Sequence, residues 1–256
     1  MRPFALALAS LLTLALAGTA FAQDPVRAMR DLIERGYWHS AAQLNGPNLI
    51  AQRPDDPEAH LLFATALYLS GDVDAAAERL AHASSLVGGG VPASHVHLAG
   101  LIRAEQGDLV GAARQLQNAF LRQPTYLHAM DWGRVAWQAG LADEAEAAFL
   151  AAAATTQGAR EAWPHLARGR VLAGRGSWEA AIEAYRTALD VYEAHDPGGP
   201  RPPSPAYVEA WYRLGEAYEE LGRLRDAEAA YRAARSVDPN HGPSVQAVDR
   251  LARRGE

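Results

Sequence analysis

Residues 211–239 read WYRLGEAYEELGRLRDAEAAYRAARSVDP. Gly222 divides this stretch into two segments, in each of which small and large side chains recur at helical spacing. A glycine takes positive φ without a Cβ clash and so ends a helix, and Pro239 ends the second segment. The stretch therefore predicts a helix, a turn and a second helix.

The turn glycine recurs along the chain, with separations of 36, 33, 36 and 46 residues. The five positions are Gly71, Gly107, Gly140, Gly176 and Gly222. Five residues after each glycine stands alanine: Ala76, Ala112, Ala145, Ala181 and Ala227. Twelve residues after it stands alanine again: Ala83, Ala119, Ala152, Ala188 and Ala234. A repeat of this length predicts helical hairpins that stack on one another, because no single hairpin can bury its apolar face alone.

Two further positions of the repeat predict close packing of the two helices in each hairpin. Seven residues before the turn the side chain is small: Ala64, Gly100, Gly133, Gly169 and Gly215. Nine residues after the turn it is large: Leu80, Leu116, Phe149, Tyr185 and Tyr231. Antiparallel helices with axes about 8 to 10 Å apart have room only for small side chains where they cross, and large ones fill the grooves beside the crossing.

These positions resemble the tetratricopeptide repeat family, and the chain is similar to exported bacterial members of it. The last unit carries the pattern of the family at Trp211, Leu214, Gly215, Tyr218, Ala227, Tyr231, Ala234 and Pro239. Other units depart from it, with His60 and His165 in the phase of Trp211 and with Arg103 and Arg168 at usually apolar positions. The resemblance implies an all-α fold, a right-handed α-solenoid of about five to six helical hairpins with a C-terminal capping helix.

The predicted domain organisation has three parts. Residues 1–22 are a signal peptide, and residues 23–56 are a degenerate helical hairpin, in which Asn45 and Asn48 break the pattern. Residues 57–256 are the repeat array, with a Pro-rich insertion at 195–205 and a capping helix at 244–254. The insertion is either a tolerated loop or a Pro-rich lip over the groove.

The N-terminus indicates export. One arginine, Arg2, precedes an apolar stretch and the small-residue pattern at 20–22, as in a secretory signal peptide; the alternative is an uncleaved anchor. The apolar stretch is shorter than the roughly 20 residues that span a bilayer, so we expect no transmembrane segment in the mature chain. We expect a periplasmic or extracellular protein, and with no cysteine it has no disulfide or thiolate site.

Composition and motifs argue against several functions. The net charge is −6 and basic residues do not cluster, which disfavours nucleic acid as a partner. No arrangement of nucleophile, base and orienting group predicts catalysis, and we expect no cofactor. His95 and His97 point away from each other on a helix, so we expect no metal site.

Binding to a peptide or protein partner is the function that the resemblance implies. In this family the first helix of each hairpin lines the concave face. Helical phase then selects Tyr68, His97, Met130, Arg134, Trp137, Gln138, Trp163, Arg170, Tyr212 and Glu216, followed by Glu219 and Glu220. Aromatic rings and arginines suit an extended peptide or an acidic tail, although Trp137 and Trp163 could instead pack between helices. Some members of the family hold a carboxylate with a set of lysine, asparagine and arginine side chains. This chain lacks that set, because Met130 and Leu166 stand where lysine is expected.

Three hypotheses of function follow. The first is a non-catalytic scaffold that binds a partner in the groove during cell-envelope assembly or secretion. The second is a structural, oligomer-forming envelope component without a peptide ligand. The third is an enzyme with its active site in the solenoid, which no motif of the sequence supports.

Overall fold

The computed structural model describes residues 24–195 and 204–254, and the predicted signal peptide lies outside them. The described residues form helices and no strand, as expected for an all-α fold. They divide into two compact units, with the boundary after Val91, so the first full hairpin belongs with the N-terminal helices. Helix α5 packs on the helices that precede it, so the predicted degenerate hairpin and the first repeat share one compact unit.

The first unit contains the degenerate hairpin and one complete hairpin. Its helices are α2 (Pro25–Glu34), α3 (Trp38–Ser40), the π-helix η2 (Ala41–Asn45), α4 (Gly46–Gln52), α5 (Pro57–Leu69) and α6 (Val73–Ser85). The break in the pattern at Asn45 and Asn48 does not end the helix, because the π-turn absorbs it and α4 continues directly. Gly46 is required there, since a Cβ would lie 2.2 Å from the Phe63 ring of α5.

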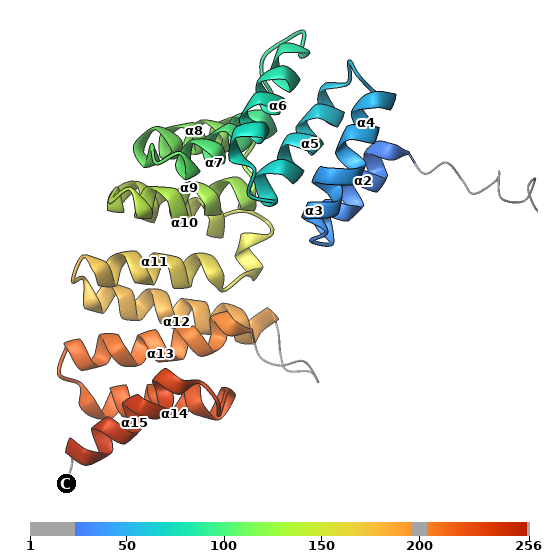
Figure 1. The fold of residues 1–256 in the computed structure, drawn as a ribbon. Coiled ribbons are helices and arrows are strands. Elements are labelled where there is room, and N and C mark those ends of the chain that lie inside the picture. The colour runs from blue at the N-terminus through green and yellow to red at the C-terminus, as the bar shows by residue number, and fades with distance from the viewer. Residues whose placement is uncertain (1–23, 196–203, 255–256) are drawn as a thin grey trace, which may run out of the picture. The chain divides into compact units, whose positions relative to one another are not determined.

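The second unit is a row of antiparallel helices that follow one another from green to red in Figure 1. They are α7 (Ala93–Glu105), α8 (Leu109–Arg122), α9 (Tyr126–Gln138), α10 (Ala142–Ala153), the short 3₁₀ helix η3 (Gly158–Arg160), α11 (Trp163–Gly174), α12 (Trp178–His195), α13 (Pro205–Glu220), α14 (Leu224–Val237) and α15 (Gly242–Arg254). Neighbours in sequence are neighbours in space, which is the arrangement of an α-solenoid.

Each predicted turn glycine ends a first helix with positive φ, and Gly36 in the degenerate hairpin does the same. At Gly71, for example, φ is 93°, the Gly71 N–H donates to Tyr68 O and the next N–H, of Asp72, donates to Leu67 O. This pair of bonds satisfies carbonyl groups that the helix end would leave free. Asp72 then caps α6 by accepting from the Ala75 N–H.

The repeat positions predicted to be small are the ones on which the large side chains pack. The ten alanines five and twelve residues after the turn are all fully buried. A Cβ added to Gly169 would lie 2.3 Å from Cε1 of Tyr185, and one added to Gly215 would lie 2.5 Å from Cε1 of Tyr231. Glycine in the first helix therefore provides the space that the large side chain of the second helix fills.

The predicted Pro-rich insertion, 195–205, lies between α12 and α13. Helix α12 continues to His195 and has 18 residues, and α13 begins at Pro205, so part of the additional length is helix. The rings of Tyr192 and Tyr207 stack with centroids 4.3 Å apart and hold these additional turns together. The remainder of the insertion, 196–203, lies outside the described residues.

The predicted capping helix is α15, which begins two residues earlier than predicted. Ala247, Val248 and Leu251 are buried, while Arg250 is exposed. These apolar side chains belong to the same core cluster as α12, α13 and α14. Helix α15 therefore covers the apolar surface that the last hairpin would otherwise leave open.

Candidate functional site

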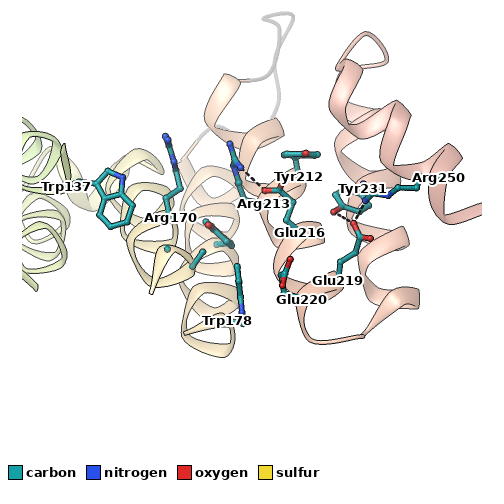
Figure 2. A pocket seen from close by; sticks show the side chains of 13 residues that line it. Trp137, Arg170, Trp178, Tyr212, Arg213, Glu216, Glu219, Glu220, Tyr231 and Arg250 are labelled. Atoms are coloured by element: carbon teal, nitrogen blue, oxygen red, sulfur yellow. Dashed lines mark hydrogen bonds and ion pairs between the residues drawn. The ribbon is translucent and has the colours of Figure 1, made fainter. Parts of the chain in front are cut away.

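A hollow of about 690 Å³ lies in the second unit and is lined by residues of α9 and α11 to α15 (Figure 2). The lining residues are Trp137, Arg170, Ala173, Gly174, Trp178, Tyr185, Tyr212, Arg213, Glu216, Glu219, Glu220, Tyr231 and Arg250. Most of them stand on the first helices α9, α11 and α13. The first helices were predicted to line the binding face.

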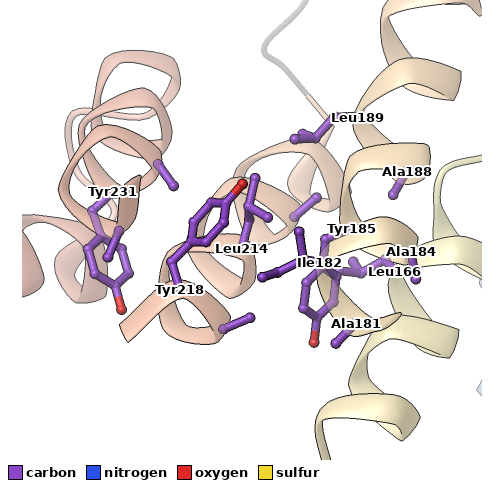
Figure 3. Packing of buried hydrophobic residues seen from close by; sticks show 14 of the residues in the cluster. Leu166, Ala181, Ile182, Ala184, Tyr185, Ala188, Leu189, Leu214, Tyr218 and Tyr231 are labelled. Atoms are coloured by element: carbon purple, nitrogen blue, oxygen red, sulfur yellow. The ribbon is translucent and has the colours of Figure 1, made fainter. Parts of the chain in front are cut away.

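Two tyrosines reach the hollow from the second helices. Tyr185 and Tyr231 are the large side chains that pack on Gly169 and Gly215, and both are almost fully buried. Figure 3 shows their hydroxyl groups directed to the same side, whereas the hydroxyl of Tyr218 points the other way. Because glycine has no side chain, each tyrosine ring packs directly against the first helix at this point, and both tyrosines line the hollow.

Helix α13 supplies most of the charged side chains that line the hollow. Arg213 donates from Nε to Glu209 and from Nη1 to Glu216, both at 2.8 Å. Burial lowers the pKa of Arg213, but the hydrogen bonds and charges of these two glutamates raise it by more. One cation thus faces two carboxylates, so these three side chains together are net negative.

Tyr212 stands beside this pair. The Arg213 guanidinium lies over the Tyr212 ring at 5.5 Å from its centroid. Burial, and then hydrogen bonding to Glu216, raise the pKa of Tyr212 to about 12. Its phenol is therefore neutral at physiological pH, and its hydroxyl can donate a hydrogen bond.

The capping helix α15 contributes Arg250 to the same surface, where it is bound to Glu219 of α13. The Tyr231 hydroxyl donates to Glu219 Oε2 at 2.6 Å, and Arg250 of α15 forms an ion pair with the same oxygen (Figure 2). Burial, followed by the hydrogen bond to Glu219, raises the pKa of Tyr231 well above its usual range. The three groups join α13, α14 and α15 at one end of the hollow.

At the other end of the hollow, Arg170 is a donor for which the described part of the chain supplies no acceptor. Among the described residues, Arg170 has no ion pair or hydrogen bond. Trp137 lies against Gly174, where a Cβ would meet its ring at 2.4 Å, and Trp178 is half-buried on α12. This end therefore offers one cation and two indole rings to a ligand.

The structure brings together only part of the predicted groove set. Four of the predicted residues line the hollow, together with the two glutamates that follow them: Trp137, Arg170, Tyr212, Glu216, Glu219 and Glu220. Tyr68 belongs to the first unit. His97, Met130, Arg134, Gln138 and Trp163 belong to the second unit but are not among the lining residues.

His97 and Arg134 are held by a carboxylate that the sequence pattern did not reveal. Asp131 accepts from His97 Nε2 at 2.8 Å and from Arg134 at 3.3 Å. Burial raises the pKa of Asp131, but its bonds to His97 and Arg134 lower it by more, so it stays ionised. The positive charge of Arg134 is therefore already balanced.

The remaining three predicted residues have other surroundings. Met130 packs against the core of α8 to α10. Gln138 is exposed at the end of α9. Trp163 stands at the start of α11 with 40% of its surface exposed.

Sequence reasoning missed Trp178, Tyr185, Arg213, Tyr231 and Arg250, which all line the hollow. A signal for two of them was present. The large position of the repeat changes from Leu or Phe in the first three units to Tyr in the last two, which adds a hydroxyl to an otherwise apolar packing position.

The described residues offer no group of three or more His, Asp or Glu side chains arranged to hold a metal ion. Across the same residues, no helix combines the length and the apolar character needed to cross a membrane.

Sequence comparison places a repeat family on the C-terminal part of the chain. The tetratricopeptide repeat model matches residues 166–241. Protein bimA of Emericella nidulans is 35% identical over 78 residues, which are 30% of this chain and 9% of that protein. The chain thus corresponds to a small part of this relative's length.

Solved structures of similar fold cover more of the chain. YrrB, described as a TPR protein with an unusual peptide-binding site, aligns with a TM-score of 0.59 and 17% identity over 79% of this chain and 96% of its own. A MamA structure aligns with a TM-score of 0.58 and 17% identity, over 72% of this chain and 92% of the MamA chain. A chain of the APC/C hetero-tetramer Cut9–Hcn1 aligns with a TM-score of 0.60 and 17% identity, over 94% of this chain and 44% of that chain. Residues 166–241 therefore match the tetratricopeptide repeat, and the described chain has the all-α solenoid fold of tetratricopeptide repeat proteins, a fold typical of protein–protein interaction scaffolds.

Proposed function

We propose that this protein is a non-catalytic scaffold that binds a peptide or a segment of a partner protein in the hollow of its second unit. The observation that carries the proposal is the end of the hollow at α9, α11 and α12. There Trp137 and Trp178 present half-buried rings, and Arg170 presents a cation that has no partner among the residues the structure describes. Large rings give contact area at low entropic cost, and an unpaired guanidinium gives directional donors.

The size and position of the hollow support this proposal. A volume of about 690 Å³ accommodates a few residues of a peptide, and the hollow extends across four consecutive repeat helices from α11 to α14. The fold resemblance to YrrB adds an analogy, since the description of that protein names a peptide-binding site. At 17% identity the analogy concerns the fold and does not carry over individual residues.

We further propose that the protein acts outside the cytoplasm, in cell-envelope assembly or secretion. Support comes from the N-terminal sequence, in which Arg2, an apolar stretch and small residues at 20–22 have the pattern of a secretory signal, and from the lack of cysteine.

The proposal is tested by panning a random peptide library against the full chain and measuring affinities of the enriched peptides by fluorescence anisotropy. We expect Trp137→Ala combined with Trp178→Ala to abolish binding, because both rings line the hollow. Trp163→Ala is the matched control, since this tryptophan is exposed but does not line the hollow, and it should bind as wild type does.

Trp178→Ala alone serves as a second variant if the double variant unfolds at a lower temperature than the wild type. No enriched peptides, or equal binding by wild type and Trp178→Ala, would overturn the proposal.

A further inference from the structure

The three arginines of the hollow differ in their partners. Arg213 is bound by Glu209 and Glu216, and Arg250 is bound by Glu219. Arg170 has no such partner among the described residues, although it stands on the same surface. In Figure 2 its side chain extends from α11 without a dashed line to any neighbour. Arg170 is therefore the one cation among the lining residues that no carboxylate of the described residues contacts.

Tyr185 supplies a second donor at the same place. The residue is 1% exposed, yet its hydroxyl lies at the hollow and has no hydrogen-bond partner among the described residues. Burial raises the pKa of Tyr185 well above its usual range, so the hydroxyl stays protonated. The equivalent hydroxyl of Tyr231 donates to Glu219, which shows what a tyrosine at this repeat position does when an acceptor is present.

The charges close to the Tyr185 hydroxyl are balanced. Those that act on it are Arg213 and Arg170, both positive, and Glu216 and Glu209, both negative. Because Arg213 is bonded to both glutamates, Arg170 is the group left to attract an anion. A singly charged group suits this setting, since a second negative charge would be repelled by the neighbouring glutamates.

We infer that Arg170 and Tyr185 form a subsite for one carboxylate of the bound segment, next to an aromatic residue of that segment that contacts Trp137 and Trp178. The inference rests on the proposed function and specifies its ligand: an acidic and aromatic peptide rather than any peptide. The carboxylate belongs either to an Asp or Glu side chain or to the C-terminus of the partner.

The test uses pools of labelled dodecapeptides with random flanks and a fixed centre, Phe-Glu, Phe-Gln or Phe-Lys, all acetylated and amidated. We expect the Phe-Glu pool to bind the full chain at least about 10-fold more tightly than the Phe-Gln pool, as for a hydrogen-bonded charge. Arg170→Gln should remove this preference, and Tyr185→Phe should reduce it about 3- to 5-fold.

Arg114→Gln is the matched control for the arginine, because Arg114 is exposed, unpaired among the described residues and outside the hollow. It should retain the preference in full. Tyr185→Phe keeps the ring that packs on Gly169, so its effect reports on the hydroxyl and not on folding.

A fourth pool distinguishes the two sources of the carboxylate. It has the Phe-Gln centre and a final Phe with a free C-terminus, and tight binding by this pool assigns the subsite to the chain end. Equal binding of the Phe-Glu, Phe-Gln and free-terminus pools would overturn the carboxylate subsite while leaving peptide binding in place. Displacement of the Phe-Glu pool by inorganic phosphate at lower concentration than by acetate would also overturn it, in favour of a phosphate site.

Discussion

Hairpin α9–α10 and hairpins α11–α12 and α13–α14 are built by the same packing but present different surfaces. In each, a large side chain of the second helix fits against a glycine of the first: Phe149 on Gly133, Tyr185 on Gly169 and Tyr231 on Gly215. Phe149 ends in carbon, whereas the two tyrosines carry a hydroxyl to the hollow. One packing position thus serves the core in every repeat and, in the last two, also serves the proposed binding surface.

The same two regions differ in how their arginines are paired. Arg134 on α9 and Arg170 on α11 each follow the small packing residue of their helix by one position. Arg134 is held by Asp131 of its own helix, while the residue three before Arg170 is Ala167. A carboxylate at one position therefore decides which arginine remains available to a ligand.

The largest expected effect tests whether the packing role is shared. Tyr231→Ala and Phe149→Ala should each lower the free energy of unfolding by about 3 to 5 kcal/mol, since each leaves a cavity against its glycine. Tyr231→Phe should cost only about 1 kcal/mol, for the hydrogen bond to Glu219. Denaturant unfolding measures all three. A Tyr231→Ala cost no greater than that of Tyr231→Phe would mean that the ring does not fill the space as described.

A smaller effect, on the pH dependence of stability, separates α7 and α9, which carry buried histidines, from α13 and α14, which carry no histidine. Burial lowers the pKa of His95 and His128 below 6.5; for His128 the Gln123 carbonyl and Asp131 act in the opposite direction without reversing it. The unfolded chain therefore binds protons near pH 6.5 that the folded chain does not bind, and stability falls as pH drops below that value. The lowered pKa of Asp131 removes stability only at more acidic pH, below the usual value of 3.8.

Hydrogen exchange at pH 7.5 and pH 5.0 measures this difference element by element. Protection should decrease more in α7 and α9, which carry the two histidines, than in α13 and α14. His128→Asn should reduce the pH dependence in α9. An equal loss of protection in both regions would contradict this assignment.

The smallest effect comes from making the two regions alike. Phe149→Tyr should change the free energy of unfolding by no more than about 0.5 kcal/mol if the hydroxyl reaches solvent beside Gly133, as that of Tyr185 reaches the hollow beside Gly169. A cost of about 1 to 3 kcal/mol would indicate a buried hydroxyl without a partner, and would confine the tyrosine arrangement to the last two repeats. The melting transition distinguishes these outcomes.

Much of the fold could be predicted because it depends on local and periodic features. The turn glycines at positive φ, the buried alanines and the small–large pairing are each visible as fixed positions in the sequence. The boundary after Val91 and the extension of α12 to His195 were not predictable, since they depend on which helices pack together and on the ring stack of Tyr192 with Tyr207.

The candidate site could be predicted only in part. Helical phase identifies which residues of a first helix face the groove, and it selected Trp137, Arg170 and Tyr212. It also selected Arg134 and His97, which both hydrogen-bond to Asp131. Phase says nothing about residues that enter from other helices, which is why Tyr185 and Arg250 were missed.

The sequence alone determined the repeat, the positions of its turns and the all-α class, because these follow from the spacing of glycine and alanine along one chain. The tertiary structure decided where the hollow lies, which arginine in it is left without a partner and which hydroxyls reach it. Those properties depend on contacts between side chains of different helices, and such contacts are fixed only when the hairpins have stacked.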